Sequence, residues 1–208
     1  MRWGFRPVKH AMRTVALVGS TAVAACGSLL GPSNPPAQIY RLSPDITGQG
    51  GGPPVAWQLA ITRPDATQTL DTDRIALLRG TVMDYYADAQ WNDTAPRLVQ
   101  SLLVAAFDSN GRVQAATRDL NLRADLTLST ELRDFEAQYD NGGGTPLVVI
   151  DIEAKLMDQR GQVIASTNER QTARAAQNTV PEVVNAFDQA MASALSKIVD
   201  WTLRTTPH

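Results

Sequence analysis

Histidine, the commonest general base and a frequent zinc ligand in enzymes, is nearly absent from this chain. The two histidines are His10, in the basic opening stretch, and His208, the last residue. A module folded between them lacks the imidazole that serine and cysteine triads and most zinc sites require. We therefore expect no metal ion and no cofactor.

Neighbouring carboxylates are the remaining candidates for acid and base chemistry. Three such pairs stand in the chain: Asp71 with Asp73, Asp84 with Asp88, and Asp151 with Glu153. A pair of this kind could supply the general acid and general base of a hydrolase. The first two pairs lie near predicted turns or helix starts, and the third alternates with Lys155 along a predicted strand. These settings favour solvated surface groups, so we expect no catalytic residues and keep a periplasmic carboxylate-dependent hydrolase as an alternative.

The single cysteine, Cys26, ends a segment with the order of an export signal. Four basic side chains lie in the first thirteen residues, an apolar run covers residues 14–23, and small residues precede the cysteine. The apolar run is too short to span a bilayer, which is typical of a secretory signal. Cleavage that leaves no lipid, after Ala24, is one alternative, and a buried cysteine in an ordinary helix is another.

Cys26 is also the residue whose chemistry is most specific. The sequence Val23-Ala24-Ala25-Cys26 resembles a lipobox, in which the thiol receives a diacylglyceryl group before cleavage. We therefore predict a lipoprotein signal peptide at residues 1–25 and lipidation of Cys26. Each buried methylene of an acyl chain such as palmitate contributes about 0.8 kcal/mol, so two or three chains give a lasting membrane anchor.

Between the cysteine and the first predicted strand lies a tether. Residues 27–37 are rich in Gly, Pro, Ser and Asn, and eleven residues reach at most about 40 Å. We assign residues 26–37 to the lipidated cysteine and tether, and residues 38–208 to one domain. Gly27 stands where an aspartate would retain a lipoprotein in the inner membrane, so similarity to sorted lipoproteins favours the outer membrane, facing the periplasm.

The composition is that of a globular domain, and its charge does not favour nucleic acid as a partner. Hydrophobic residues make up 43% and charged residues 19% of the 208, which suffices for one core. After Cys26 the chain has 15 basic and 21 acidic side chains, a net charge of about −6. That sign gives no general attraction for phosphate backbones.

The apolar pattern predicts an α+β domain. Helical spacing marks residues 95–107 and 180–203, and Asn110-Gly111 is a stop signal for the first of these helices. Alternation or short apolar runs predict strands at 38–43, 55–62, 74–78, 82–86, 113–120, 126–139, 147–157 and 162–175. The inward set changes parity near Arg133-Asp134, which predicts a bulge there. We expect a mainly antiparallel sheet of five to seven strands with two helices packed on one face.

Several linked motifs resemble the ABC-type transport auxiliary lipoproteins, a family that includes the PqiC intermembrane transport lipoproteins. They are the lipobox, Tyr40-Arg41-Leu42, LDTDRIAL at 70–77, DYYADAQW at 84–91 and PRLVQSLL at 96–103. The resemblance covers Cys26 to about Gln114, and four or more motifs in a fixed order are more specific than any one of them.

The resemblance implies a non-enzymatic part of a trans-envelope lipid transport system. Its partners would be an MCE-domain protein with the associated ABC permease and ATPase, and docking on a ring-shaped MCE partner would favour a homo-oligomer. Tyr85, Tyr86 and Trp91 are candidate docking residues because aromatic side chains give large contact areas at low entropic cost. The alternative is that at least two of these three residues pack in the core or in a turn. A structural lipoprotein of another envelope assembly is the competing function.

Overall fold

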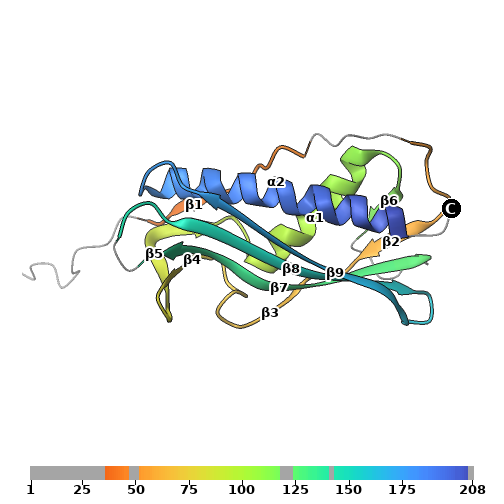
Figure 1. Cartoon of the computed structure of the whole chain (residues 1–208), viewed down its shortest axis with the longest axis horizontal. Helices are drawn as coiled ribbons and strands as arrows, with labels where there is room; N and C mark the ends of the chain where they lie inside the picture. Colours follow the sequence, from red (N-terminus) through yellow and green to blue (C-terminus); the bar gives the residue numbers. More distant parts are fainter. Residues whose placement is uncertain (1–35, 47–51, 118–123, 141–142, 206–208) are drawn as a thin grey trace, which may run out of the picture. The chain divides into compact units, whose positions relative to one another are not determined.

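The computed structural model describes residues 36–46, 52–117, 124–140 and 143–205, and the signal, Cys26 and most of the tether lie outside these ranges. The described residues fall within one compact unit, residues 35–208. They form two helices and nine strands that belong to one sheet, with both helices on the same face (Figure 1). The α+β architecture agrees with the sequence, whereas the expected five to seven strands are too few.

A long hairpin forms the centre of the sheet. Strand β7 (Leu126–Tyr139) pairs antiparallel with β8 (Leu147–Asp158), which pairs antiparallel with β9 (Val163–Arg174). In β8 the alternating side chains Val148, Ile150 and Ile152 are completely buried. The predicted bulge is confirmed, because the register of β7 against β8 shifts between Leu132 and Asp134. The extra residue lets the apolar set of β7 face the core on both sides of the shift.

The other edge of β7 contradicts the expectation of a mainly antiparallel sheet. Three short strands pair with it in parallel, one after another: β2 (Gln58–Ile61), β3 (Asp65–Ala66) and β4 (Arg74–Arg79). Strand β6 (Gln114–Thr117) is parallel to β2, and β1 (Gln38–Tyr40) is parallel to β5 (Val82–Trp91). Only β4 with β5 and the β7–β8–β9 meander are antiparallel. The sheet is therefore mixed.

The helices close the core. Helix α1 (Ala95–Asn110) starts after Thr94 and carries Pro96 in its first turn, where the missing amide hydrogen costs nothing. It ends at Gly111, whose φ of 72° allows the left-handed cap predicted from Asn110-Gly111. Helix α2 (Val180–Thr205) buries a stripe that includes Phe187, Met191 and Leu195 against the sheet. Neither of these two helices has the length and apolar composition needed to cross a bilayer.

Candidate functional site

The β4–β5 hairpin carries aromatic, basic and apolar side chains on both of its faces. A two-residue loop joins the strands, and Gly80 has a φ of 60°, as tight hairpins of this length require. Val82, next to the loop, is 64% exposed. We call the set that follows the hairpin surface; it comprises Arg74, Arg79, Val82, Met83, Tyr85 and Tyr86.

Tyr85 and Arg74 form the firmest contact of the hairpin surface. The Arg74 guanidinium lies 3.8 Å from the centroid of the Tyr85 ring, a cation–π arrangement. The Tyr85 hydroxyl donates a hydrogen bond of 3.0 Å to the carbonyl of Thr69. Asp71, a sequence neighbour of Arg74, instead pairs with Arg63. The ring is thus held in a fixed position while remaining partly exposed.

Tyr86 belongs to a chain of hydrogen bonds that includes Tyr139 of β7 and Asn178, which precedes α2. Its hydroxyl lies 2.8 Å from that of Tyr139, which donates a 2.7 Å hydrogen bond to Asn178. Burial and the bond to Tyr139 raise the pKa of the Tyr86 hydroxyl above its ordinary value of 10.0. Arg79 lies 5.2 Å from the centroid of the Tyr139 ring. Tyr86 therefore stays protonated and tied into the fold.

Trp91 is not a surface residue, and its prediction as a docking residue is wrong for the folded chain. Its side chain is 1% exposed and contacts Phe135 and Phe187, with ring centroids 5.9 Å and 5.1 Å away. A bulge in β5 explains the difference. Gln90 pairs with Arg74 but Tyr85 pairs with Ala76, and Asp88 between them has a φ of 53°. The irregularity turns Trp91 inward although strict alternation would place it with Tyr85.

A family model for the ABC-type transport auxiliary lipoprotein component matches residues 40–199. The chain belongs to this family. A crystal structure of a DUF330-family protein from Xanthomonas campestris is 30% identical, covers 81% of this chain and 96% of that one, and has a TM-score of 0.75. A crystal structure of a second, uncharacterised protein is 17% identical, covers 81% of this chain and 99% of that one, and has a TM-score of 0.64. It shows the shared fold.

One curated relative is longer than this chain. An uncharacterised protein of Bradyrhizobium diazoefficiens is 30% identical over 172 residues, which are 80% of this chain and 46% of the relative. The auxiliary lipoprotein thus spans about half the length of the curated relative that it matches. The family name associates it with an ABC-type transport system.

Four of the six paired carboxylates, Asp71, Asp84, Asp151 and Glu153, are engaged in ion pairs or backbone contacts. Asp151 bonds with Arg170, which also pairs with Asp134, while Glu153 pairs with Arg133. Asp84 accepts a hydrogen bond from the backbone of Tyr85. Among the residues that the structure describes, no group of three or more acidic, His or Cys side chains could hold a metal ion.

The polar residues of β8 suggest that the sheet face opposite the helices is solvated. Glu136, on the same face, is nevertheless buried. Its side chain is 2% exposed and lies on a strand position between Ala76 and Val149. The carboxylate accepts hydrogen bonds from the backbone of Phe135 (2.7 Å) and the amide of Gln138 (2.9 Å). Burial raises its pKa above the ordinary 4.5, and nearby Asp134 adds to the rise.

Glu136→Gln is expected to stabilise the auxiliary lipoprotein at neutral pH by roughly 1 kcal/mol, because it removes a buried charge. The new amide oxygen can accept from the backbone N–H of Phe135, and the new NH2 can donate to the amide oxygen of Gln138 after that side chain turns its amide around. A raised pKa in the folded state means that the wild type loses stability as pH rises from 4.5 through the folded value. The variant lacks this loss. Urea unfolding at mildly acidic and neutral pH measures both effects, and exposed Glu131→Gln serves as the control. A variant less stable than wild type at neutral pH contradicts the expectation.

Reasoning from the sequence missed four members of the hairpin surface: Arg74, Arg79, Val82 and Met83. Gly80-Thr81 between two apolar runs is the signal that marks a hairpin tip, and exposed Val82 beside it is the residue that this signal could have identified. Cys26 lies outside the described residues, so its lipidation stays a prediction.

Proposed function

We propose that the auxiliary lipoprotein is anchored through Cys26 to the outer membrane and docks a trans-envelope lipid transport system from the periplasmic side. The observation that carries the proposal is the family match over residues 40–199, joined to the lipobox at Val23-Ala24-Ala25-Cys26. The partners are an MCE-domain protein with its ABC permease and ATPase. The role is adaptor rather than catalyst, since the lipobox cysteine is acylated and both histidines lie at the chain ends.

The hairpin surface is the docking site that we propose for the MCE-domain partner. It combines arginine, tyrosine and methionine, which are enriched in protein interfaces, with an exposed valine. Tyr85 is held in place by Arg74 and Thr69, so little conformational freedom is lost on binding. Val82 and Tyr85, which β5 directs to opposite faces, would make the direct contacts with a partner that encloses the end of the hairpin, while Tyr86 is held in the fold by Tyr139.

Affinity purification of the full-length lipoprotein from membranes tests the role. We expect permease, ATPase and MCE-domain subunits of one transport system to be recovered with it. Recovery of a secretion or barrel-assembly complex in their place would contradict the proposal and support the structural alternative.

Substitutions in the hairpin surface test the docking site. Val82→Asp combined with Tyr85→Ala should lower recovery of the MCE-domain partner at least about tenfold, the loss expected for one hot-spot side chain. Val163→Asp is the matched control, because Val163 is also an exposed strand valine, at 54% against 64% for Val82. Equal losses in the two proteins, or no loss in either, would contradict docking through this hairpin.

A further inference from the structure

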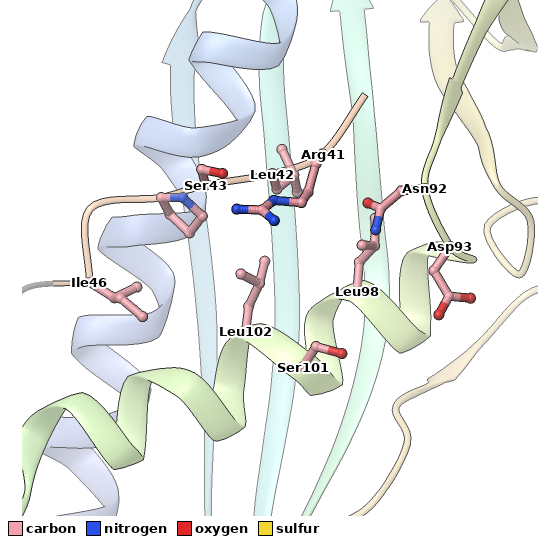
Figure 2. A pocket seen from close by; sticks show the side chains of 10 residues that line it. Arg41, Leu42, Ser43, Ile46, Asn92, Asp93, Leu98, Ser101 and Leu102 are labelled. Carbon is pink, nitrogen blue, oxygen red and sulfur yellow. The ribbon is translucent and has the colours of Figure 1, made fainter. Parts of the chain in front are cut away.

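A groove with a volume of about 350 Å³ lies beside helix α1 (Figure 2). One wall is residues 41–46, which we call the strap and which follow β1. The other wall is the outer side of α1, and the end next to the β5–α1 corner holds Asn92 and Asp93. Neither the hairpin surface nor the carboxylate networks contribute a residue to this groove.

The groove has an apolar floor and a wall that is fixed in place. Leu42 and Leu98 are buried, and Leu102 is half-buried between them and solvent. The backbone N–H of Ser43 donates a 2.7 Å hydrogen bond to Asp188 of α2, and the carbonyl of Ile46 accepts one of 3.0 Å from Ser109. The strap is thus held at both ends, and a ligand would find the groove already formed.

Two opposite charges line the groove, and within the described residues neither has an ion-pair partner. The Asp93 carboxylate accepts one hydrogen bond, of 2.8 Å, from the backbone N–H of Thr94. Other arginines of the described chain, such as Arg63, Arg133 and Arg170, pair with carboxylates. Within the described ranges Arg41 has no such partner and does not pair with Asp93, although both residues line this one cavity. Figure 2 shows the Arg41 guanidinium above Leu102 and Asp93 near the start of α1. A ligand with separated positive and negative groups would complement both.

We propose that this groove binds a zwitterionic phospholipid of the phosphoethanolamine type. Arg41 binds the phosphate, Asp93 binds the ammonium group, and the apolar floor takes the first part of one acyl chain. The volume of about 350 Å³ is near the lower end of the range for ligand sites, so it suits a headgroup with part of a chain and excludes a whole two-chain lipid. This assignment rests on the lipid transport role proposed above and adds a lipid class to it.

The tether length is compatible with a lipid taken from the anchoring membrane. Arg41 stands fifteen positions after Cys26, a stretch of chain that reaches at most about 50 Å. A domain held at Cys26 can therefore bring the groove to the bilayer surface, where phosphoethanolamine headgroups lie.

Photolabelling of the full-length lipoprotein in detergent micelles tests the groove. The probes are phosphatidylethanolamine and phosphatidylglycerol, each with a diazirine in one acyl chain. The ethanolamine probe should label peptides from the strap and α1. Arg41→Gln should lower labelling by both probes about fivefold. Asp93→Asn should lower labelling by the ethanolamine probe about fivefold and leave labelling by the glycerol probe unchanged or stronger. These losses are of the size expected for charge contacts at exposed side chains. Arg97→Gln and Asp108→Asn, exposed charges elsewhere on α1, should change neither.

Three outcomes would overturn the assignment: labelling spread evenly over the chain, labelling insensitive to Arg41→Gln and Asp93→Asn, or labelling abolished by equimolar free phosphoethanolamine, which would leave no role for the acyl chain. Circular dichroism of each variant shows that it is folded. Transport subunits still recovered with a lipoprotein that shows no groove labelling would overturn the lipid site alone, whereas their absence from wild type would overturn the proposed function.

Discussion

Trp91→Ala is expected to remove much of the stability of the domain. The side chain is 1% exposed, and its ring joins Phe135 of β7 and Phe187 of α2 in one cluster, with the latter two centroids 4.9 Å apart. Truncating a buried tryptophan costs about 3–5 kcal/mol, a large part of the roughly 5–15 kcal/mol that holds a domain of this size folded. Urea unfolding followed by circular dichroism measures the loss.

Two substitutions serve as controls for this result. Trp91→Phe should cost much less than Trp91→Ala, because it keeps an aromatic ring in the cluster and the indole N–H has no hydrogen-bond partner in the described structure. Ile39→Ala, at a position that is 65% exposed, should change stability by less than about 0.5 kcal/mol. If Trp91→Ala unfolded at the wild-type urea concentration, the cluster of Trp91, Phe135 and Phe187 would not be the centre of the core.

Cys26→Ser is expected to abolish lipid attachment and leave the precursor uncleaved. A hydroxyl cannot replace the thiol that receives the diacylglyceryl group, and lipidation precedes cleavage at a lipobox. Without acyl chains, each of which would contribute about 0.8 kcal/mol per buried methylene, the lasting anchor is lost. Metabolic labelling with a palmitate analogue and electrophoresis of whole cells measure both changes.

The control for Cys26→Ser is Ser28→Ala, two residues beyond Cys26, which should be labelled and processed like wild type. Normal processing of Cys26→Ser would favour the alternative of cleavage after Ala24. Continued labelling of Cys26→Ser by the palmitate analogue would contradict lipidation at this residue.

The sequence predicted those parts of the fold in which local periodicity decides the structure. Val148, Ile150 and Ile152 recur at alternate positions of an apolar pattern, and all three are buried. The parity change near Arg133 predicted a bulge, and the register shift confirms it. One extra residue reverses the side-chain alternation of a strand, so the same face stays buried on both sides of it only where the strand bulges. Gly111 ended α1 because a left-handed cap favours glycine.

Strand pairing was not predictable in the same way. Parallel partners require a crossover, here β5, α1 and β6 between β4 and β7, and nothing local in β2, β3 or β4 encodes which distant strand they join. The bulge at Asp88 was missed for a related reason: aspartate tolerates positive φ but does not demand it. Strict alternation from Tyr85 would place Trp91 on the same face as Tyr85, so the inward position of Trp91 could not be predicted from the sequence.

The groove and the buried carboxylate also depended on distant contacts. The strap meets α1 and α2 at residues more than sixty positions away, as Ile46 with Ser109 and Ser43 with Asp188 show. Glu136 follows Phe135 in a polar-looking stretch, and its burial becomes visible only when β4 and β8 flank it. Neither feature has a signal within a window of a few residues.

Mass spectrometry of the mature amino terminus, on protein extracted from the outer membrane, tests the lipid-anchored adaptor role most directly. We expect the first residue to be Cys26, with a mass increase equal to a diacylglyceryl group and an amide-linked acyl chain. A mature chain that begins at another residue, or at Cys26 with an unmodified thiol, would contradict the anchor and the docking role that depends on it.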